Sequence, residues 1–523
     1  MPIRSNHPEP SRPEGQTQPF TGLVGQLAGL LKPYTIRLVV VVLLLTGLAL
    51  VNMAIPASIG IIFNEVFPNR LTWLLWALLP GILVVYLLRN VLFAGTKAIT
   101  MPMGEQICFH LRRRLFQRLQ VQNLPFYRDH HPGELSSRVM DDTFTVQTFV
   151  QDDVPKLFQA ACLFVSLVVV LYVINWRLGV VTTLVLPLHI VVFRYFRQNI
   201  KQTSQAVQES LASVHGNLVE KFLGMDVVQG FTGEDRENEA FVQAIDRSRE
   251  SQLASKKLHV LQKITADVLI GLGTVALLGF GGYEVMKDSV SAMQPGTFVA
   301  YFGFVGMLYP TVTVLMGTLA KMVRAGASLD RIEQMLTPDP AESAFTDVSR
   351  GPVLGHLSFF WVSVRYGSGP EVLKDITLEI PKGTFCILRG PSGSGKTVLV
   401  NLVARFIAPS HGRILLDATD LVTADVKRLR ESIGIAFQEC FLFNATLLEN
   451  LRYAKPNATI DQINRVATIT GVDELIRRLP DGYETLLGEH GWNLARGEKQ
   501  KVALARALLK EPRILIMDEA TVS

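Results

Sequence analysis

The residues best suited to chemistry lie in a glycine-rich stretch in the second half of the chain. Residues 385–400 read F-C-I-L-R-G-P-S-G-S-G-K-T-V-L-V, so the pattern G-x-x-x-x-G-K-[ST] stands between two apolar runs. Glycine has no Cβ, so such a loop can point its N–H groups at a phosphate, and the following helix adds the positive end of its dipole. The loop is therefore predicted to bind a nucleotide through Gly390, Ser392, Gly393, Ser394, Gly395, Lys396 and Thr397.

Two side chains of this loop have separate expected roles. Lys396 would reach the β- and γ-phosphates as a point charge, and the Thr397 hydroxyl would hold Mg²⁺. A second group follows at residues 513–519, which read R-I-L-I-M-D-E. An apolar strand delivers Asp518 and Glu519 at its carboxyl end, where ligands collect in parallel sheets. Asp518 would hold Mg²⁺ through water, and Glu519 would act as general base for an attacking water.

Each group also has a purely structural explanation. The loop would then be a chance glycine-rich turn, and the two carboxylates would cap a helix. The surrounding pattern favours the nucleotide site, because β-type runs alternate with helical stretches from about residue 352, as in an α/β domain. The helical stretches are expected after Lys396, before Arg430 and from Lys499 to Leu509. Strands are expected at residues 357–365, 376–380, 385–388, 413–416, 433–437 and 514–517.

The first 320 residues have a different composition. Hydrophobic residues make up 48% of the chain and are concentrated there in long runs that carry few charges. About 20 apolar residues suffice to cross a bilayer. Six spans are predicted, at residues 38–63, 71–93, 157–176, 178–195, 266–285 and 297–320. A soluble protein would have to bury several such runs inside one domain, which is the weaker explanation.

The connections between these spans predict their orientation. Short connections follow the first, third and fifth spans, whereas roughly 70 residues follow the second and the fourth. The first long connection carries Arg112, Arg113, Arg114 and Arg118, so the positive-inside rule places both long connections and both chain ends in the cytosol. No proline occurs between residues 194 and 294, which predicts helices that continue out of the membrane as hairpins.

Other features of the chain narrow the class of protein to which it can belong. The formal charge of +5 is mild and does not indicate a nucleic-acid partner, and the four cysteines lack the spacing of a metal site. Residues 1–20 contain five prolines and are predicted to be a disordered cytosolic tail rather than a signal peptide. Residues 21–31 would form a short helix along the membrane surface, and residues 336–351 a linker.

Taken with these motifs, the chain resembles a half-transporter of the ABC exporter family over nearly all residues beyond Phe20. Gln438 in I-A-F-Q-E resembles the family's glutamine that meets Mg²⁺ and the attacking water, and Tyr366 in V-S-V-R-Y resembles the aromatic residue that stacks on adenine. Tyr366 has the alternative of being a core strand residue. Residues 487–491 (L-G-E-H-G) resemble an element of the exporters, and residues 133–138 and 218–234 resemble the tips of the two cytosolic hairpins.

The resemblance implies a fold, cofactors and partners. The expected fold is an all-α six-helix transmembrane domain (residues 21–335) with long cytosolic helical hairpins, followed by an α/β P-loop nucleotide-binding domain (residues 352–523). ATP and Mg²⁺ are the implied cofactors. The hairpin tips would dock on the nucleotide-binding domains. A second half-transporter would complete a dimeric transporter in a bacterial inner (cell) membrane.

The family's signature L-S-G-G-Q has a changed counterpart here. In the family this segment clasps the γ-phosphate that is bound by the opposite subunit. Ala495 cannot offer a serine hydroxyl, and Arg496 replaces a residue without a side chain, so this half of the site would be weakened unless Arg496 contacts phosphate. Both a homodimer and a heterodimer stay open. The resemblance assigns ATP contacts to Leu494, Ala495, Arg496, Gly497 and Glu498.

The sequence ends at Ser523, four residues after Glu519. The family's later switch histidine has no counterpart, so the nucleotide-binding domain is expected to be C-terminally incomplete, with weak hydrolysis if that end is genuine. The leading hypothesis is ATP-driven export of a hydrophobic or amphipathic compound along an aromatic-rich path formed by Trp73, Trp76, Tyr301, Phe302, Phe304 and Tyr309. The alternatives are a membrane-anchored nucleotide switch or kinase, whose motifs are missing, and a poorly hydrolysing regulatory subunit. Charged span residues such as Arg89 and Asp267 are interpreted as helix-end groups rather than ligands.

Overall fold

The computed structural model describes residues 25, 29, 31–287, 293–336, 353–366, 369–438, 440–488, 491 and 493–518. Contacts between residues divide the chain into two units. The first comprises Met1–Arg114 and Arg138–Ile332, and the second comprises Leu115–Ser137 and Glu333–Ser523. The tip of the first long connection therefore groups with the C-terminal half. The predicted tail at residues 1–20 and nearly all of the predicted linker lie outside the described residues.

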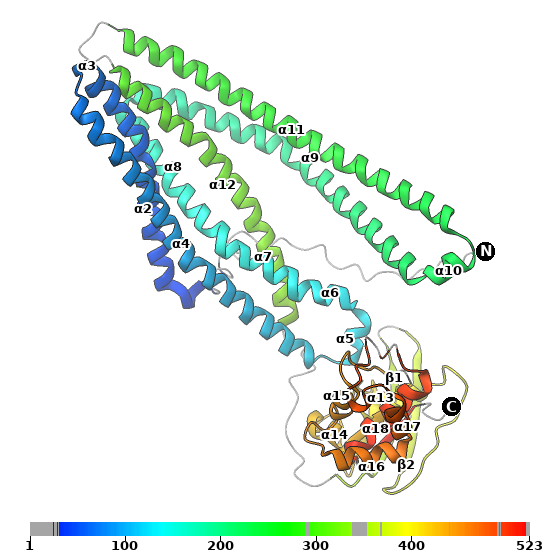
Figure 1. Cartoon of the computed structure of the whole chain (residues 1–523). Helices are drawn as coiled ribbons and strands as arrows, with labels where there is room; N and C mark the ends of the chain where they lie inside the picture. The colour runs from blue at the N-terminus through cyan, green and yellow to red at the C-terminus, as the bar shows by residue number, and fades with distance from the viewer. Residues whose placement is uncertain are drawn as a thin grey trace. The chain divides into compact units, whose positions relative to one another are not determined.

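Among the described residues up to Leu336, all regular elements are helical (Figure 1). Short 3₁₀ or π-helical turns (η) interrupt some of them. In chain order they are η1 (Lys32–Tyr34), α2 (Thr35–Ile61), η2 (Ile62–Val66), α3 (Phe67–Asn69), α4 (Thr72–Gln120), α5 (Leu124–Asp129), α6 (Pro132–Ser137), η3 (Arg138–Asp142), α7 (Thr143–Thr148), η4 (Phe149–Asp153), α8 (Val154–Ile174), α9 (Trp176–Leu223), α10 (Met225–Gly230), α11 (Glu234–Met286) and α12 (Pro295–Leu336).

Six helical segments of the described chain are long and apolar enough to cross a membrane, which confirms the predicted number of spans. They contain α2, α4, α8, α9, α11 and α12 in turn. Lipid offers no hydrogen-bond partners to the backbone, so a spanning segment satisfies its own N–H and C=O groups as a helix. Prolines such as Pro80 and Pro187 nevertheless lie within continuous helices.

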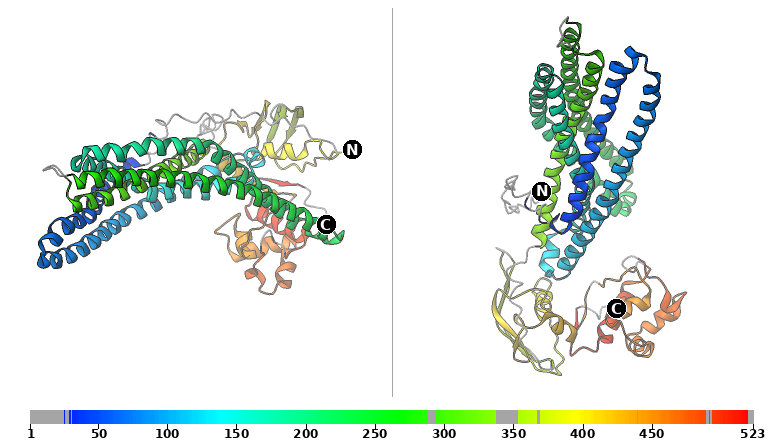
Figure 2. Two further views of the ribbon diagram at one scale, coloured as in Figure 1. Left: turned by 90° about the horizontal axis from the view of Figure 1, so that it is seen from above. Right: turned by 90° about the vertical axis from the view of Figure 1, so that its left-hand side faces the viewer.

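The second long connection is a helical hairpin. α9 and α11 are 48 and 53 residues long and pack against each other, with α10 at the turn (Figures 1 and 2). Near that turn the Lys221 ammonium lies 2.8 Å from a carboxylate oxygen of Glu237 and so joins the two helices. The predicted continuation of helix beyond the spans is therefore confirmed. The cytosolic side of the hairpin stays a prediction.

The spans of the first unit share an apolar core. Tyr301 and Leu308 of α12, Leu171 of α8 and Leu277 of α11 are fully buried members of it. At one end, a Cβ on Gly296 would lie only 2.4 Å from the carbonyl oxygen of Gly60, so glycine permits the close approach of α12 to α2.

A side chain of η2 fastens the same contact. Asn64 Oδ1 accepts the N–H of Gly296 at 2.7 Å, and Asn64 Nδ2 donates to Thr297 Oγ1 at 2.9 Å. The start of the last span is therefore held to the end of the first by hydrogen bonds between neutral groups.

Two ion pairs connect α12 to the segment before α8. Arg331 donates to both carboxylate oxygens of Asp142 in η3, and Lys321 donates to Asp153 Oδ1 in η4 at 2.7 Å. Both carboxylates are buried. The hydrogen bond with Asp142 raises the pKa of Arg331 above its ordinary value. A buried carboxylate needs such a partner, since burial of an unpaired charge is costly.

The described residues of the C-terminal half form two sheets. An antiparallel sheet has the strand order β2-β1-β3-β4, and β5 pairs with β6 in parallel. The elements are β1 (Leu357–Arg365), β2 (Glu371–Ile380), α13 (Lys396–Val403), β3 (His411–Leu416), β4 (Thr419–Asp420), α14 (Val426–Ser432), β5 (Ile433–Ala436), α15 (Leu447–Arg452), α16 (Ile460–Thr470), α17 (Val472–Arg478), η6 (Gly482–Glu484), α18 (Arg496–Leu509) and β6 (Ile514–Met517).

One predicted strand is wrong. Residues 385–388 form no strand, and Phe385 and Ile387 are 80% and 73% exposed. A strand requires a neighbouring backbone to pair with, and no described strand pairs with these residues. The other five predicted strands overlap β1, β2, β3, β5 and β6.

Asp417 provides a test of the second unit's stability. Its carboxylate accepts the N–H groups of Leu354, Gly355 and His356 at 2.6 to 3.1 Å. Burial by itself would raise the pKa of Asp417, but the backbone N–H groups outweigh it and lower that pKa. A lowered pKa in the folded state contributes stability above the unfolded pKa of about 3.9, and this contribution is lost as the pH falls through the folded pKa.

We expect Asp417→Asn to lower the free energy of unfolding by about 1 kcal/mol at pH 7, with the difference from wild type shrinking between pH 4 and pH 3. Thermal unfolding of the full chain in detergent from pH 7 to pH 3 measures it. Asp246→Asn is the control, because the pair of Asp246 with Arg249 is exposed and should contribute little. A pH-independent difference would contradict the assignment.

Candidate functional site

The phosphate loop of the sequence pattern leads directly into α13. Gly393 and Gly395 have φ angles of +81° and +87°, in the left-handed region that side chains rarely adopt. A Cβ on Gly395 would also lie 2.5 Å from Leu373 Cδ2 of β2. The loop conformation thus depends on glycine at this position, both for the backbone angle and for the packing on β2.

Lys396 folds back over the loop that precedes it. Its Nζ donates to the carbonyl oxygens of Gly390 and Pro391, each at 2.9 Å. These bonds fix the ammonium beside the loop. A positive charge and the N-terminal N–H groups of α13 are therefore gathered at one place, an arrangement suited to an anion of the phosphate type.

Thr397 and Asp518 come together although they are far apart in the sequence. The Thr397 hydroxyl donates to Asp518 Oδ2 at 3.5 Å, and the Asp518 N–H donates to the carbonyl oxygen of Ala436 in β5 at 2.9 Å. Hydroxyl and carboxylate oxygens are ligands that Mg²⁺ prefers. These two predicted magnesium ligands therefore fit that ion, which would neutralise phosphate charge when bound.

The parallel pairing of β5 and β6 sets the edge at which these groups lie. Ile433 pairs with Ile514 and Ala436 with Met517, so both strands end at the same edge of the sheet. Asp518 directly follows β6, and Gln438 follows β5 by two residues and is exposed. Gln438 and Asp518 thus leave the sheet at its carboxyl edge. Glu519, the predicted general base, lies outside the described residues.

Tyr366 directly follows β1 and is 38% exposed. The alternative of a core strand residue is therefore wrong. The stacking of its ring on adenine stays a prediction.

The altered signature forms the start of α18. Leu494 is buried, and Ala495 is the N-cap. Glu498 accepts the N–H of Ala495 at 2.8 Å and also pairs with Arg478 of α17. Arg496, the first residue of the helix, is exposed, and none of its described neighbours bonds to it. The structure therefore gives Glu498 a capping role that the sequence analysis did not assign.

A further network that the sequence analysis missed holds the segment after Gln438. Asn450 of α15 is buried and bonds to both the N–H and the C=O of Phe443, at 2.9 and 3.0 Å. Arg506 of α18 donates to the carbonyl oxygens of Asn450 and Phe441 at 2.7 and 2.6 Å. The available signal was an asparagine inside an apolar helical run, where a polar side chain needs a partner.

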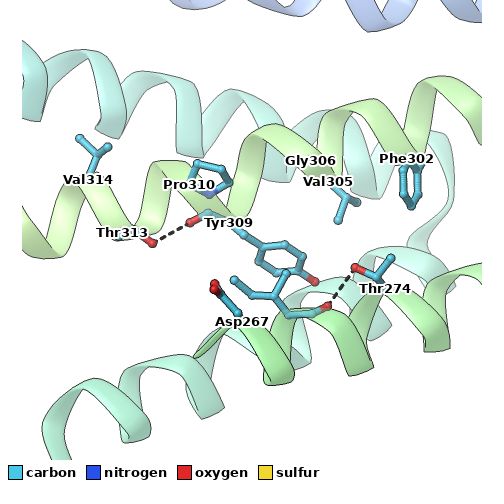
Figure 3. Close-up of a pocket in the computed structure, with 10 residues that line it drawn as sticks. Asp267, Thr274, Phe302, Val305, Gly306, Tyr309, Pro310, Thr313 and Val314 are labelled. Carbon is cyan, nitrogen blue, oxygen red and sulfur yellow. Dashed lines mark hydrogen bonds between the residues drawn. The ribbon is translucent and has the colours of Figure 1, made fainter. Parts of the chain in front are cut away.

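A second candidate site lies among the spans of the first unit. A cavity of about 630 Å³ lies between α11 and α12 (Figure 3). Of the aromatic residues expected on a substrate path, Phe302 and Tyr309 line this cavity. Tyr301 and Phe304 are buried in the core, and Trp73 and Trp76 are exposed on α4. The size suits a drug-sized ligand.

Comparison with known proteins accords with this architecture. The family described as "ABC transporter transmembrane region" matches residues 38–309, and the family described as "ABC transporter" matches residues 373–522. An ATP-dependent lipid A-core flippase of Syntrophus aciditrophicus is 29% identical over 98% of this chain and 85% of its own length. A mitochondrial potassium channel ATP-binding subunit of Xenopus tropicalis is 31% identical over 94% of this chain and 72% of its own length.

A solved structure shares the fold. The structure of a bacterial Atm1-family ABC exporter with ATP bound superposes with a TM-score of 0.77 at 22% identity. The match covers 93% of this chain and 86% of that one.

Gly395→Ala tests the phosphate loop. We expect at least a fivefold loss of affinity for a fluorescent ATP analogue, because the new Cβ would collide with Leu373 and strain the backbone by about 1 kcal/mol or more. Gly383→Ala is a matched control, since Gly383 also has a positive φ (+76°) but no neighbour within 4 Å of its Cβ position. Equal affinities of the two variants would show that the contact with β2 does not shape the site.

Proposed function

Because the chain belongs to the ABC transporter family, with transmembrane region and ATPase domain in one polypeptide, we propose that it exports a hydrophobic or amphipathic compound as one half of a dimer. The proposal rests above all on the convergence of Lys396, Thr397 and Asp518, which joins the phosphate loop to the strand end that carries the predicted magnesium ligand. The proposed ATP site and the membrane helices thus belong to one polypeptide, so that ATP would supply the energy for transport.

In this proposal each residue of the nucleotide site has one task. Lys396 and the loop N–H groups bind the phosphates of ATP, and Thr397, Asp518 and Gln438 surround Mg²⁺. Tyr366 stacks on adenine, and Glu519 orients and deprotonates the attacking water. The exposed position of Tyr366 and the shared sheet edge of Gln438 and Asp518 support these assignments.

The second subunit supplies what one chain lacks. Residues 494–498 would contact a nucleotide held by the partner, with Arg496 exposed at the start of α18 and available to phosphate. Binding of ATP between two such domains would favour the closed dimer, and the long helices would carry that change to the spans. Either an identical or a related half-transporter fits this role.

The proposed location is the bacterial inner (cell) membrane, with the N-terminus and the ATPase domain in the cytosol. The clustered arginines of residues 112–118 support this orientation, because basic residues gather on the cytosolic side. The substrate class is supported by the apolar cavity between α11 and α12, and by the lipid A-core that the flippase relative is named for.

A second candidate function is that of a poorly hydrolysing subunit of a heterodimer. The observation that favours it is Ala495, the N-cap of α18, which has no hydroxyl to offer to a nucleotide. Such a subunit would still bind ATP at Lys396.

Lys396→Ala tests the leading proposal. We expect ATP hydrolysis by the full chain in proteoliposomes to fall at least tenfold, with a parallel loss of binding of a fluorescent ATP analogue, because the phosphates lose a charge-assisted contact. Lys382→Ala removes an exposed lysine nearby and should leave both unchanged. Hydrolysis at the wild-type rate by Lys396→Ala would refute the proposal, and binding without hydrolysis in wild type would favour the second candidate.

Ala495→Ser separates the two candidates further. A serine hydroxyl would complete the cap of α18 with Glu498 and restore a donor toward a partner's nucleotide, so we expect a several-fold faster hydrolysis rate. Ala495→Gly serves as the control, because glycine also suits an N-cap but adds no hydroxyl. The same rate in both variants would exclude the missing hydroxyl as the cause of slow turnover.

A further inference from the structure

We propose that the cavity between α11 and α12 binds amphipathic cations, and that the carboxylate of Asp267 recognises their charged group. The inference rests on the proposed export function for its biological meaning and names the substrate class of that function. It changes the interpretation of Asp267 from a helix-end residue to a ligand-binding one.

The position of Asp267 places a charge on the wall of an otherwise apolar cavity. In Figure 3 its side chain extends from α11 into the space beside the ring of Tyr309 of α12. Ile270, Val305 and Val314 supply aliphatic walls, and Phe302 adds a second aromatic ring. A carboxylate with neighbouring aromatic faces is the chemistry that attracts an organic cation.

The carboxylate of Asp267 has no cationic partner in the described part of the chain. Three acidic side chains in or beside the spans do have such partners, since Asp152 pairs with Lys97, Asp153 with Lys321, and Glu284 with Arg177. Lys263 precedes Asp267 by one helical turn, yet no ion pair joins them. A carboxylate without a cationic partner inside a predicted span is a candidate for binding a ligand rather than for stabilising the fold.

The hydroxyl donors of the cavity are already used. Thr274 donates to the carbonyl oxygen of Ile270 at 2.9 Å, and Thr313 donates to that of Tyr309 at 3.3 Å. The Tyr309 hydroxyl donates to the carbonyl oxygen of Thr182 at 3.4 Å. The lining residues include no lysine, arginine or histidine. The cavity therefore offers an acceptor and a negative charge but no uncommitted donor, which favours cations over anions.

The depth of Asp267 matches an amphipathic molecule. It precedes the end of α11 at Met286 by 19 residues, or about 28 Å at the helical rise, so it lies near one boundary of a hydrocarbon core about 30 Å thick. Ile270 and Thr274 continue from it along α11 toward the membrane interior. A charged head at Asp267 would thus leave the apolar body of the ligand among Ile270, Val305 and Phe302.

Two probes of nearly equal size and opposite charge test the proposal. The full chain in phosphatidylcholine nanodiscs, without nucleotide, is titrated with tetraphenylphosphonium and, in parallel, with tetraphenylborate, and binding to protein-free nanodiscs is subtracted. We expect Asp267→Asn to weaken tetraphenylphosphonium binding about tenfold and to leave tetraphenylborate binding unchanged or stronger. Asp267→Glu, which keeps the charge, should retain the preference for the cation.

Glu250→Gln is the control for loss of an acidic residue, because Glu250 is exposed on the same helix far from the cavity. It should bind both probes as wild type does. Equal binding of tetraphenylphosphonium by wild type and Asp267→Asn would overturn the proposal. An equal loss of both probes in Asp267→Asn would also overturn it, since the residue would then only shape the cavity.

The binding assay uses no ATP, so its outcome is separate from that of the proposed function. Cation preference without ATP hydrolysis would support the site and refute export. Hydrolysis with active export but without charge preference would refute the site alone.

Discussion

The membrane-spanning half of this protein is built on one constraint, the absence of hydrogen-bond partners for the backbone in hydrocarbon. Each span must satisfy its own N–H and C=O groups, so it is a continuous helix, and α9 and α11 keep that regularity for 48 and 53 residues. A helix that leaves the bilayer without a break is a stiff rod of 1.5 Å per residue. Length and stiffness together let a change at one end reach the other.

Ion pairs lie where the long helix α12 contacts its neighbours. Asp142 and Asp153 are buried, and each has a cation of α12 as its partner. α12 is also the last span and the helix that precedes the ATPase half of the chain. Its two ion pairs connect it to η3 and η4, which follow the hairpin tip that groups with the C-terminal unit. Displacement of that tip would therefore act on α12 through paired charges, and separating either pair would leave a buried carboxylate without its cation, which is costly.

Local sequence signals predicted much of this architecture, and tertiary context decided the rest. The spans, β1 and β6 were predictable because uncharged runs and apolar strand patterns depend on local composition. The run at residues 385–388 has the same pattern, but a strand also needs a partner backbone, and the pattern does not reveal one. Two separate motifs pointed to Lys396 with Thr397 and to Asp518, and the structure brings the loop and the strand end together. The cap that Glu498 makes on Ala495 is local, but its altered sequence context hid it, and the pairing of Glu498 with Arg478 and of Asn450 with Arg506 joins residues that are 20 and 56 positions apart. Single-residue patterns do not identify such distant partners.

The contact of Gly60, Asn64 and Gly296 has a different character from the ion pairs farther along α12. It consists of close backbone packing and hydrogen bonds between neutral groups, whereas Lys321 and Arg331 carry full charges that are partly exposed. Dissolved salt weakens contacts between charges more than contacts between neutral groups, although the burial of Asp142 and Asp153 limits this screening. The two ends of this helix should thus differ in their response to ionic strength, with the charged end the more sensitive of the two.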